Sequence, residues 1–235
     1  MKLVGCLVSC LVAILMVNGC ASTKVSDREI LVTERVPRPD HILIYDFAAT
    51  PADVPADSSL AAAATAGTPQ TPEQIETGRR VGAAIATRVA EKVRRMGLPG
   101  ERASTQSAPQ INDIVIRGYL LSVAEGSTAK RVAIGFGAGA SELSVAVEGY
   151  QMTAQGLRKL GSGAGTSGGS KTPGAVAPAG VAIATANPIG LVVGTGIKGY
   201  GEVSGTSKIE GRVEKIANEI AKQLEPRFRE QGWIK

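Results

Sequence analysis

The feature that most constrains the fold is a stripe of apolar and small residues along residues 72–97. A helix start precedes it, because Thr71 can cap a helix, Pro72 suits the first helical position and Gln74 completes a capping box. The stripe recurs at steps of three and four and ends before Gly97. Its members are Ile75, Gly78, Gly82, Ile85, Val89, Val93 and Met96. A helix with such a face needs a partner to cover it, and the two glycines would allow a sheet to approach closely.

A second amphipathic helix is expected over residues 207–231. The segment from Ser207 to Glu210 resembles a capping box. One face of the following helix carries Ile209, Val213, Ile216, Ile220, Leu224 and Phe228. Pro226 is expected to kink or end the helix near its last turn, and Trp233 to fold back as a terminal anchor.

Three segments have the composition of β-strands: residues 41–47, 113–124 and 141–153. In the last of them, Leu143, Val145 and Val147 alternate with Ser144, Ala146 and Glu148, so the two sets face opposite ways. Residues 154–156 look like a hairpin turn into a short strand near 157–160. Together with the helices, these strands predict a single small α/β domain of the α+β type. Its sheet would be mostly antiparallel, with about four strands and both helices on one face.

The first twenty residues predict export and attachment to lipid. Lys2 precedes an apolar stretch of signal-peptide length, which is short for a membrane-spanning helix. The segment Val17-Asn18-Gly19-Cys20 resembles the lipobox of bacterial lipoproteins. The resemblance implies cleavage between Gly19 and Cys20 and acyl chains on the thiol and the amine of Cys20. Ala21 and Ser22 follow without an Asp, which by analogy implies sorting to the outer membrane; the alternative is an ordinary secretory signal.

The expected organisation follows from these boundaries. Residues 1–19 are a signal peptide that is removed, 20–39 a lipidated tether in which residues 30–32 could add an edge strand, and 40–232 the domain. Within the domain we expect a mobile loop at 49–71, a flexible loop at 161–174 and a Gly/Ala-rich, partly helical segment at 175–205.

Two glycine-rich stretches are candidates for close packing. Gly135, Gly137 and Gly139 alternate strictly, and a strand pattern follows them. A phosphate-binding loop would lead into a helix, so close packing or a bend between strands is the better interpretation.

The second stretch, residues 172–197, has no charge, and small residues recur there every four positions, including Ala186, Gly190 and Gly194. It could span a membrane, pack as a small-residue helix on a protein neighbour, or form a loop. Prolines interrupt the segment and disfavour a membrane-spanning helix, so a small-residue helix packed on a protein neighbour is favoured.

Little in the sequence supports enzyme chemistry. His41 is the only imidazole, at a strand start beside Asp40, while Asp46 and Asp113 lie near strand ends without a partner visible in sequence. We therefore predict no catalytic residue. One His and three Cys exclude a Cys/His zinc cluster, so neither a metal nor a cofactor is expected. Aromatic residues are too scarce to suggest a nucleic-acid partner.

Basic residues surround the first helix and form a candidate contact surface for anions. They are Arg79, Arg80, Arg88, Lys92 and Arg95. A solvated helix face is the simpler interpretation. Contact with anionic lipid headgroups or envelope polymers is the more specific one.

The order of these segments resembles the domain of unknown function 4410 family. The likeness runs over about residues 40–232 and is most specific in the string RVAIGFGAGASELSVAVEGY. It implies a bacterial envelope location and a small α/β domain, with no established activity and no catalytic residues.

We therefore expect a lipid-anchored envelope protein with a non-catalytic structural or interaction role at the periplasmic face of the outer membrane. Its partners would be the membrane, through the acyl chains on Cys20, and either a second copy or another envelope protein. Two alternatives remain open. One is a subunit of an oligomeric secretion or pore-type assembly. The other is a binding module for a small apolar ligand held between the sheet and the Gly/Ala-rich segment.

Overall fold

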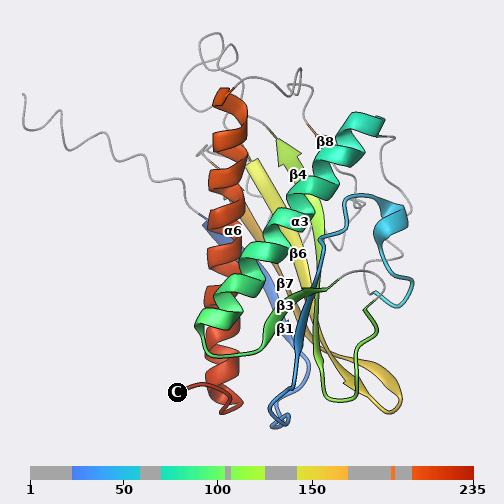
Figure 1. Ribbon diagram of the computed structural model, residues 1–235, viewed down its shortest axis with the longest axis vertical. Coiled ribbons are helices and arrows are strands. Elements are labelled where there is room, and N and C mark those ends of the chain that lie inside the picture. Colours follow the sequence, from blue (N-terminus) through green and yellow to red (C-terminus); the bar gives the residue numbers. More distant parts are fainter. Residues whose placement is uncertain (1–22, 59–69, 104–106, 125–141, 169–191, 194–202) are drawn as a thin grey trace, which may run out of the picture.

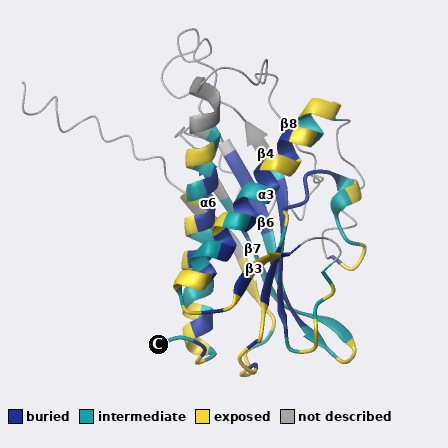
Figure 2. Ribbon diagram, viewed as in Figure 1, coloured by how far each residue is buried: buried dark blue, intermediate teal, exposed yellow. Residues whose placement is uncertain are grey.

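The computed structural model describes residues 23–58, 70–103, 107–124, 142–168, 192–193 and 203–235. Two long helices, α3 (Pro72–Arg95) and α6 (Val203–Glu230), lie on the same face of one sheet (Figure 1). Their buried residues look toward the sheet, and their outer residues are exposed (Figure 2). In the described part of the chain, neither helix is long and apolar enough to cross a membrane.

The sheet is mixed. Its described strands follow the order β1 (Thr23–Ile30), β7 (Gly156–Gly168), β6 (Glu142–Thr153), β4 (Ile114–Ala124), β2 (Ile42–Tyr45) and β3 (Gly100–Ala103), and β8 (Val192–Val193) also pairs with β4. Neighbours from β1 to β4 are antiparallel, whereas β4–β2, β2–β3 and β4–β8 are parallel. The α+β class and the position of both helices on one face are confirmed. The sheet has more strands than the four expected, and it is mixed rather than mostly antiparallel.

Helix α3 forms as the sequence predicts. The Thr71 hydroxyl accepts from the Gln74 N–H at 3.3 Å, and the Gln74 side chain accepts from the Thr71 N–H at 2.9 Å. The helix lies so close to the segment after β2 that a Cβ added at Gly82 would come 2.2 Å from the Phe47 carbonyl oxygen. The predicted close approach is therefore confirmed at Gly82.

Helix α6 begins at Val203 rather than at Ser207, and it continues through Pro226 to Glu230. Only four residues follow Pro226 within the helix. Because proline lacks an N–H, one backbone hydrogen bond is lost, but the loss falls in the last turns of the helix. Beyond it, the Trp233 ring lies 5.4 Å from the Phe228 ring and its Nε1 donates to the Val36 carbonyl at 3.0 Å. The terminal anchor is thus confirmed.

The segment 20–39, expected as a tether that could add an edge strand at residues 30–32, adds one at residues 23–30 instead. Residues 23–30 form the edge strand β1, which pairs with β7, and Val36 is buried in the core. These residues belong to the domain because β7 leaves an unpaired edge that an adjacent segment can hydrogen-bond.

The predicted flexible loop at 161–174 is wrong over residues 161–168, which continue β7. Pairing with β6 on one side and β1 on the other supplies the backbone hydrogen bonds that glycine-rich composition alone does not predict. In the segment 175–205, residues 192–193 are a strand beside β4 and not a helix, as suits two β-branched valines.

Several predicted residues lie outside the described part of the chain. They are Gly19, Cys20, Gly135, Gly137, Gly139, Ala186, Gly190 and Gly194. In the loop predicted at 49–71, residues 49–58 are described, and they include the short helix η1 (Pro51–Asp53) with its own capping box.

Candidate functional site

The two faces of the sheet carry different chemistry, and each holds a candidate site. On β6, Leu143 and Val145 are buried in the core beneath the helices, while Ala146 belongs to a separate apolar cluster on the other face. That second face also carries Glu148, whose side chain is buried. The predicted alternation is therefore confirmed, but its polar half is enclosed rather than solvated.

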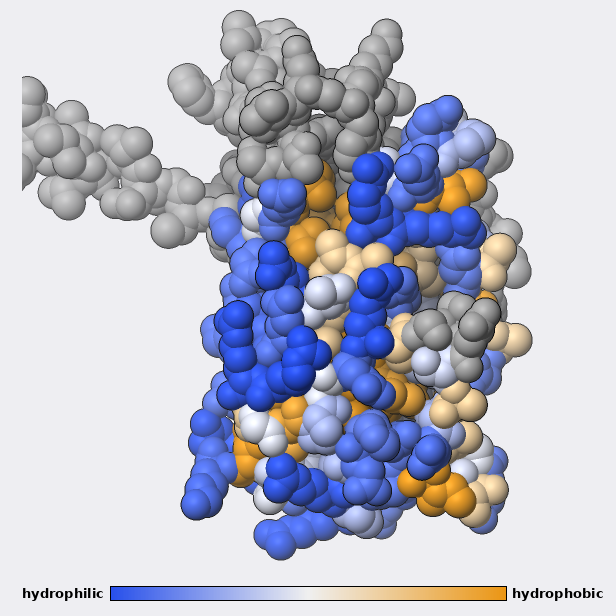
Figure 3. All heavy atoms as spheres, in the orientation of Figure 1, coloured by the Kyte–Doolittle hydropathy of each residue, from blue (hydrophilic) through white to orange (hydrophobic). Residues whose placement is uncertain are grey.

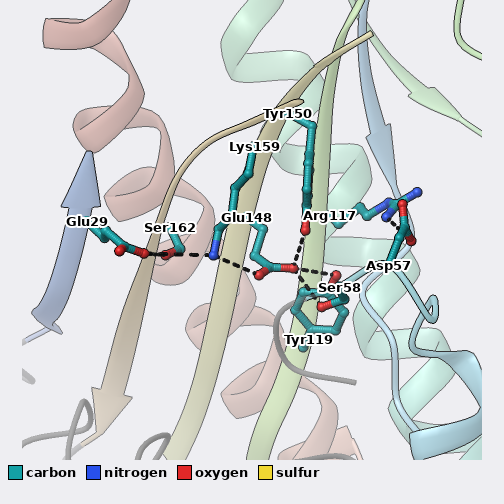
Figure 4. Close-up of polar contacts among 9 residues, drawn as sticks. All are labelled: Glu29, Asp57, Ser58, Arg117, Tyr119, Glu148, Tyr150, Lys159 and Ser162. Atoms are coloured by element: carbon teal, nitrogen blue, oxygen red, sulfur yellow. Dashed lines mark hydrogen bonds and ion pairs between the residues drawn. The ribbon is translucent and has the colours of Figure 1, made fainter. Parts of the chain in front are cut away.

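Glu148 stands at the centre of the polar cluster (Figure 4). Only 1% of the residue is exposed. Its Oε2 accepts hydrogen bonds from three hydroxyls: Ser58 at 2.7 Å, Tyr119 at 2.9 Å and Tyr150 at 2.7 Å. Its Oε1 lies 3.2 Å from the Lys159 Nζ. A buried carboxylate requires this kind of compensation, because desolvation without partners costs several kcal/mol.

Four parts of the chain supply the cluster. Tyr119 comes from β4, Glu148 and Tyr150 from β6, Lys159 from β7, and Ser58 from the segment after η1. These strands are hydrogen-bonded neighbours, so the side chains that share this face meet directly. The cluster therefore fastens the 57–58 segment to the sheet.

The cluster extends to charged residues at both sides (Figure 4). The Arg117 guanidinium pairs with Asp57 at 2.8 Å and lies 5.2 Å from the centre of the Tyr150 ring. On the other side, the Ser162 hydroxyl donates to Glu29 at 3.2 Å. These contacts tie the outer strands and the covering segment into one polar layer.

The electrostatics keep the tyrosines as donors. Burial, and then the neighbouring Glu148 carboxylate, raises the pKa of Tyr150 above its ordinary value. Burial is also the largest cause of the raised pKa of Tyr119. Both hydroxyls therefore stay protonated at physiological pH and can donate. Because both Glu148 oxygens are already engaged, the arrangement is suited to holding structure rather than to proton transfer.

The second candidate is an apolar pocket of about 190 Å³ on the helix-covered face, between α6 and the strands β6 and β7. Its floor contains Gly149 and Gly163, where an added Cβ would meet no atom within 4 Å. Its roof includes Ile220 and Leu224 of α6, which are only partly buried. Figure 3 shows this side of the molecule, with hydrophobic residues visible between the hydrophilic outer surfaces of the helices.

The candidate anion-contact residues of α3 are largely paired within the protein. Arg79 pairs with Asp53 at 2.9 Å, and Arg88 with Glu91 at 3.0 Å. The remaining members, Lys92, Arg80 and Arg95, all lie on the same helix, and Lys92 contacts Glu214 of α6 at 2.6 Å. Anion contact stays a prediction, but three of its five residues have acidic partners.

These ion pairs shift the carboxyl groups. Burial raises the pKa of Asp53, but hydrogen bonds from Arg79 and Thr50 outweigh it, and the pKa lies below its ordinary value. The hydrogen bond from Lys92 is the largest cause of the lowered pKa of Glu214. Both carboxyl groups are therefore ionised at physiological pH.

The structure gives partners to His41, Asp46 and Asp113, which the sequence left without one. His41 Nδ1 lies 3.1 Å from the Asp113 Oδ1, and Asp113 is buried while His41 is half exposed. Asp46 accepts two hydrogen bonds from Arg102, at 2.6 and 2.7 Å. Both pairs join residues far apart in sequence, which explains why local patterns did not reveal them.

Sequence reasoning missed the Glu148 cluster and the pocket. The alternation in β6 placed Glu148 away from the core, although Tyr119 and Tyr150 on neighbouring strand positions offered a signal for a buried polar group. The alternating glycines in the second half of β7, at positions 161, 163 and 165, were interpreted as a flexible loop. Their alternation with Ser162 and Ala164 was the signal for a strand with one bare face.

Comparison with known proteins shows one family and distant similarity to solved structures, among them two PelC structures. The family model described as "Domain of unknown function (DUF4410)" matches residues 42–186. A PelC variant dodecamer from Paraburkholderia phytofirmans has a TM-score of 0.38 and 14% identity, with 83% of this chain and 94% of that chain covered. A second PelC dodecamer structure from that organism has a TM-score of 0.35 and 12% identity, with 83% and 95% covered. These scores are too low to support conclusions about assembly. Among curated proteins, none matches the sequence.

Proposed function

The chain belongs to the DUF4410 family, and from this premise we propose that it is a lipid-anchored protein of the bacterial envelope with a non-catalytic structural or interaction role at the outer membrane. One observation carries the proposal: strand β1 begins at Thr23, three residues after Cys20. Three residues span at most about 11 Å, so acyl chains on Cys20 would hold the sheet directly at the bilayer surface.

The register of the sheet supports one orientation toward that surface. Thr23 pairs with Ser167 near the end of β7, and Gly168 pairs with Glu142 at the start of β6. The chain therefore leaves the described sheet for residues 125–141 and 169–191 at the same end as Thr23. An anchored domain would therefore hold this end of the sheet toward the membrane.

The polar cluster supports a role without catalysis. Both oxygens of Glu148 are engaged by hydroxyls and by Lys159. A general acid or base needs an oxygen free to reach a substrate, and these oxygens are used to hold the fold together.

Mass spectrometry of the protein extracted from membranes tests the anchor. We expect an N-terminal Cys20 with a diacylglyceryl group, which carries two acyl chains, on the thiol and one acyl chain on the amine. A Cys20→Ala variant should be lost from the membrane-anchored fraction, or should retain its signal peptide. Cys10→Ala is the matched control, because it lies within the segment that we expect to be removed. A free thiol at Cys20 would refute the proposal.

A second function, as a subunit of an oligomeric secretion or pore-type assembly, is favoured by the edge of the sheet. Strand β1 has a neighbour on only one side among the described strands, and Ile30 and the adjacent Leu31 are 41% and 51% exposed. A strand edge without a neighbour, with exposed apolar residues where the strand ends, is a site for pairing with another chain.

Light scattering on the full chain in detergent tests this second function. An assembly should dissociate in a Leu31→Lys variant. The same change at Ile111, which is 69% exposed, should leave the assembly intact. A strictly monomeric wild-type protein would contradict the assembly and would leave the anchor proposal unaffected.

A further inference from the structure

The pocket beneath α6 exists because one strand face lacks side chains. Gly163 pairs with Val147, and Gly161 pairs with Gly149, so these positions point toward the helix layer. Protein interiors are normally packed to high density, and neighbouring side chains would be expected to fill such a space. Here a Cβ at Gly149 or Gly163 would meet nothing within 4 Å.

The pocket has the size and chemistry of a site for a small apolar group. Its volume of about 190 Å³ exceeds the ~150 Å³ of a dry cavity known to accept benzene. Among its lining residues, Val145, Val147, Ile216 and Trp233 are apolar. Pockets of this kind bind ligands through apolar walls and a small number of polar groups at defined places.

A cation is available at the edge of this pocket. Four charged residues line it: Arg28, Glu29, Glu219 and Arg227. Three of them have partners, because Glu29 accepts from Ser162, Glu219 accepts from Gln223, and Arg227 donates to the Val32 carbonyl. Within the described residues, Arg28 is exposed and forms neither a hydrogen bond nor an ion pair.

We propose that this pocket binds a single-chain amphiphile with an acidic headgroup, of the fatty-acid class. The apolar chain enters the space above Gly149 and Gly163, and the carboxylate pairs with Arg28. An arginine recognises a carboxylate through charge-assisted hydrogen bonds, and a largely apolar wall favours a hydrocarbon chain. The site does not depend on acylation of Cys20.

The single tryptophan of the chain offers a direct readout, because Trp233 lines the pocket. The full chain is placed in nanodiscs of zwitterionic phosphatidylcholine and titrated with ω-bromoundecanoate, whose bromine quenches tryptophan on contact. We expect saturable quenching of Trp233. Unbrominated undecanoate should compete with it.

Matched variants assign the two ends of the ligand. Gly163→Val fills the pocket and should weaken binding at least tenfold, whereas Gly211→Ala, on α6 but outside the pocket, should not change it. Arg28→Gln should weaken the binding of ω-bromoundecanoate by about two- to fivefold, as expected for an exposed ion pair, and should not change the binding of ω-bromoundecanol. Arg35→Gln is the control for loss of one nearby exposed charge. If Gly163→Val does not fold, Gly149→Ala replaces it.

The proposal is overturned if the wild type shows no saturable quenching, or if quenching persists unchanged in Gly163→Val. An Arg28→Gln variant that weakens the alcohol as much as the carboxylate would overturn the assignment of the headgroup. If Gly163→Val instead changes the oligomeric mass measured by light scattering, the occupant is a second copy of the chain and not an amphiphile. A Cys20→Ala chain should bind ω-bromoundecanoate as the wild type does, which separates this result from the fate of the anchor.

Discussion

The helix-covered face of the sheet carries Leu143 and Val145 against two helices, whereas the other face carries Glu148 against a short segment that includes Ser58. The first face gains stability from apolar contact, which is non-directional and spread over many residues. The second relies on a small number of directed hydrogen bonds, which converge on one buried carboxylate. The comparison teaches that the helix-covered face can contain a hollow because its contacts are dispersed. The polar face depends much more on a single residue, Glu148.

Removal of the Glu148 carboxylate should have the largest effect. Glu148→Ala leaves Lys159 and the three hydroxyls without their common acceptor, and we expect a loss of about 3–5 kcal/mol in the free energy of unfolding. Denaturant unfolding followed by circular dichroism measures it. Glu148→Gln should lose less, because its amide oxygen still accepts.

Glu101, exposed on the edge strand β3, provides the control for Glu148. Glu101→Ala should change the free energy of unfolding by no more than about 0.5 kcal/mol. A loss below about 1 kcal/mol in Glu148→Ala would show that the polar face does not depend on this carboxylate.

The tightest contact on the helix-covered face comes next. A Cβ at Gly82 would lie 2.2 Å from the Phe47 carbonyl oxygen, so Gly82→Ala should push α3 away from the sheet. We expect a loss of about 1–3 kcal/mol in the free energy of unfolding, larger than the helix-propensity gain of alanine. Thermal unfolding reports the change. Gly211→Ala on the exposed side of α6 should instead stabilise by up to about 1 kcal/mol, and similar results for both variants would contradict the close approach.

The hollow part of the same face should respond in the opposite direction. Gly163→Val adds apolar surface where nothing lies within 4 Å, and valine favours strands. We expect a gain of about 1 kcal/mol in the free energy of unfolding from this burial. Denaturant unfolding of the ligand-free protein measures it. Destabilisation would mean that the space beneath α6 is smaller than the structure shows.

The part-buried ion pair between Lys92 of α3 and Glu214 of α6 should have the smallest effect and a defined pH dependence. The hydrogen bond from Lys92 lowers the pKa of Glu214 below its ordinary value of 4.5. A lowered folded-state pKa stabilises above the unfolded-state value, and that stabilisation disappears as the pH falls through the folded-state pKa.

The difference between wild type and Glu214→Gln should therefore be under about 1 kcal/mol at pH 7, because the Glu214 side chain is half exposed and its charge is screened by water, and it should vanish in acid. Unfolding curves at several pH values test this sign. A difference that grows on acidification would contradict the pairing of Lys92 with Glu214.

Local signals in the sequence were sufficient for some elements and not for others. The cap at Thr71, the stripe of α3 and the turn before Gly156 each depend on residues within one or two turns of chain, and they are confirmed. Strand β3 (Gly100–Ala103) has no strand-like composition, and it exists because β2 offers a parallel edge. Such pairings depend on distant segments, which a reading of neighbouring residues does not detect.

The candidate sites were less predictable for the same reason. Ser58 and Glu148 are 90 positions apart, and Tyr119 is 29 positions from Glu148. The pocket exists because no side chain fills the space above Gly163. The position of α6 over β7 encloses that space, and neighbouring residues in the sequence do not reveal it. The sequence predicts the alternation of β6 but not which groups enclose its polar half.

The junction at Trp233 has a consequence for the order in which the domain can form. Trp233 Nε1 donates to the Val36 carbonyl across 197 positions, and the Gln231 side chain accepts from the Val36 N–H across 195. Residues near Trp233 therefore secure the segment around Val36, which is synthesised 197 positions earlier. Contacts of such long sequence separation form slowly and late. A nascent chain lacks this closure until Trp233 has been synthesised, so the segment around Val36 is secured late.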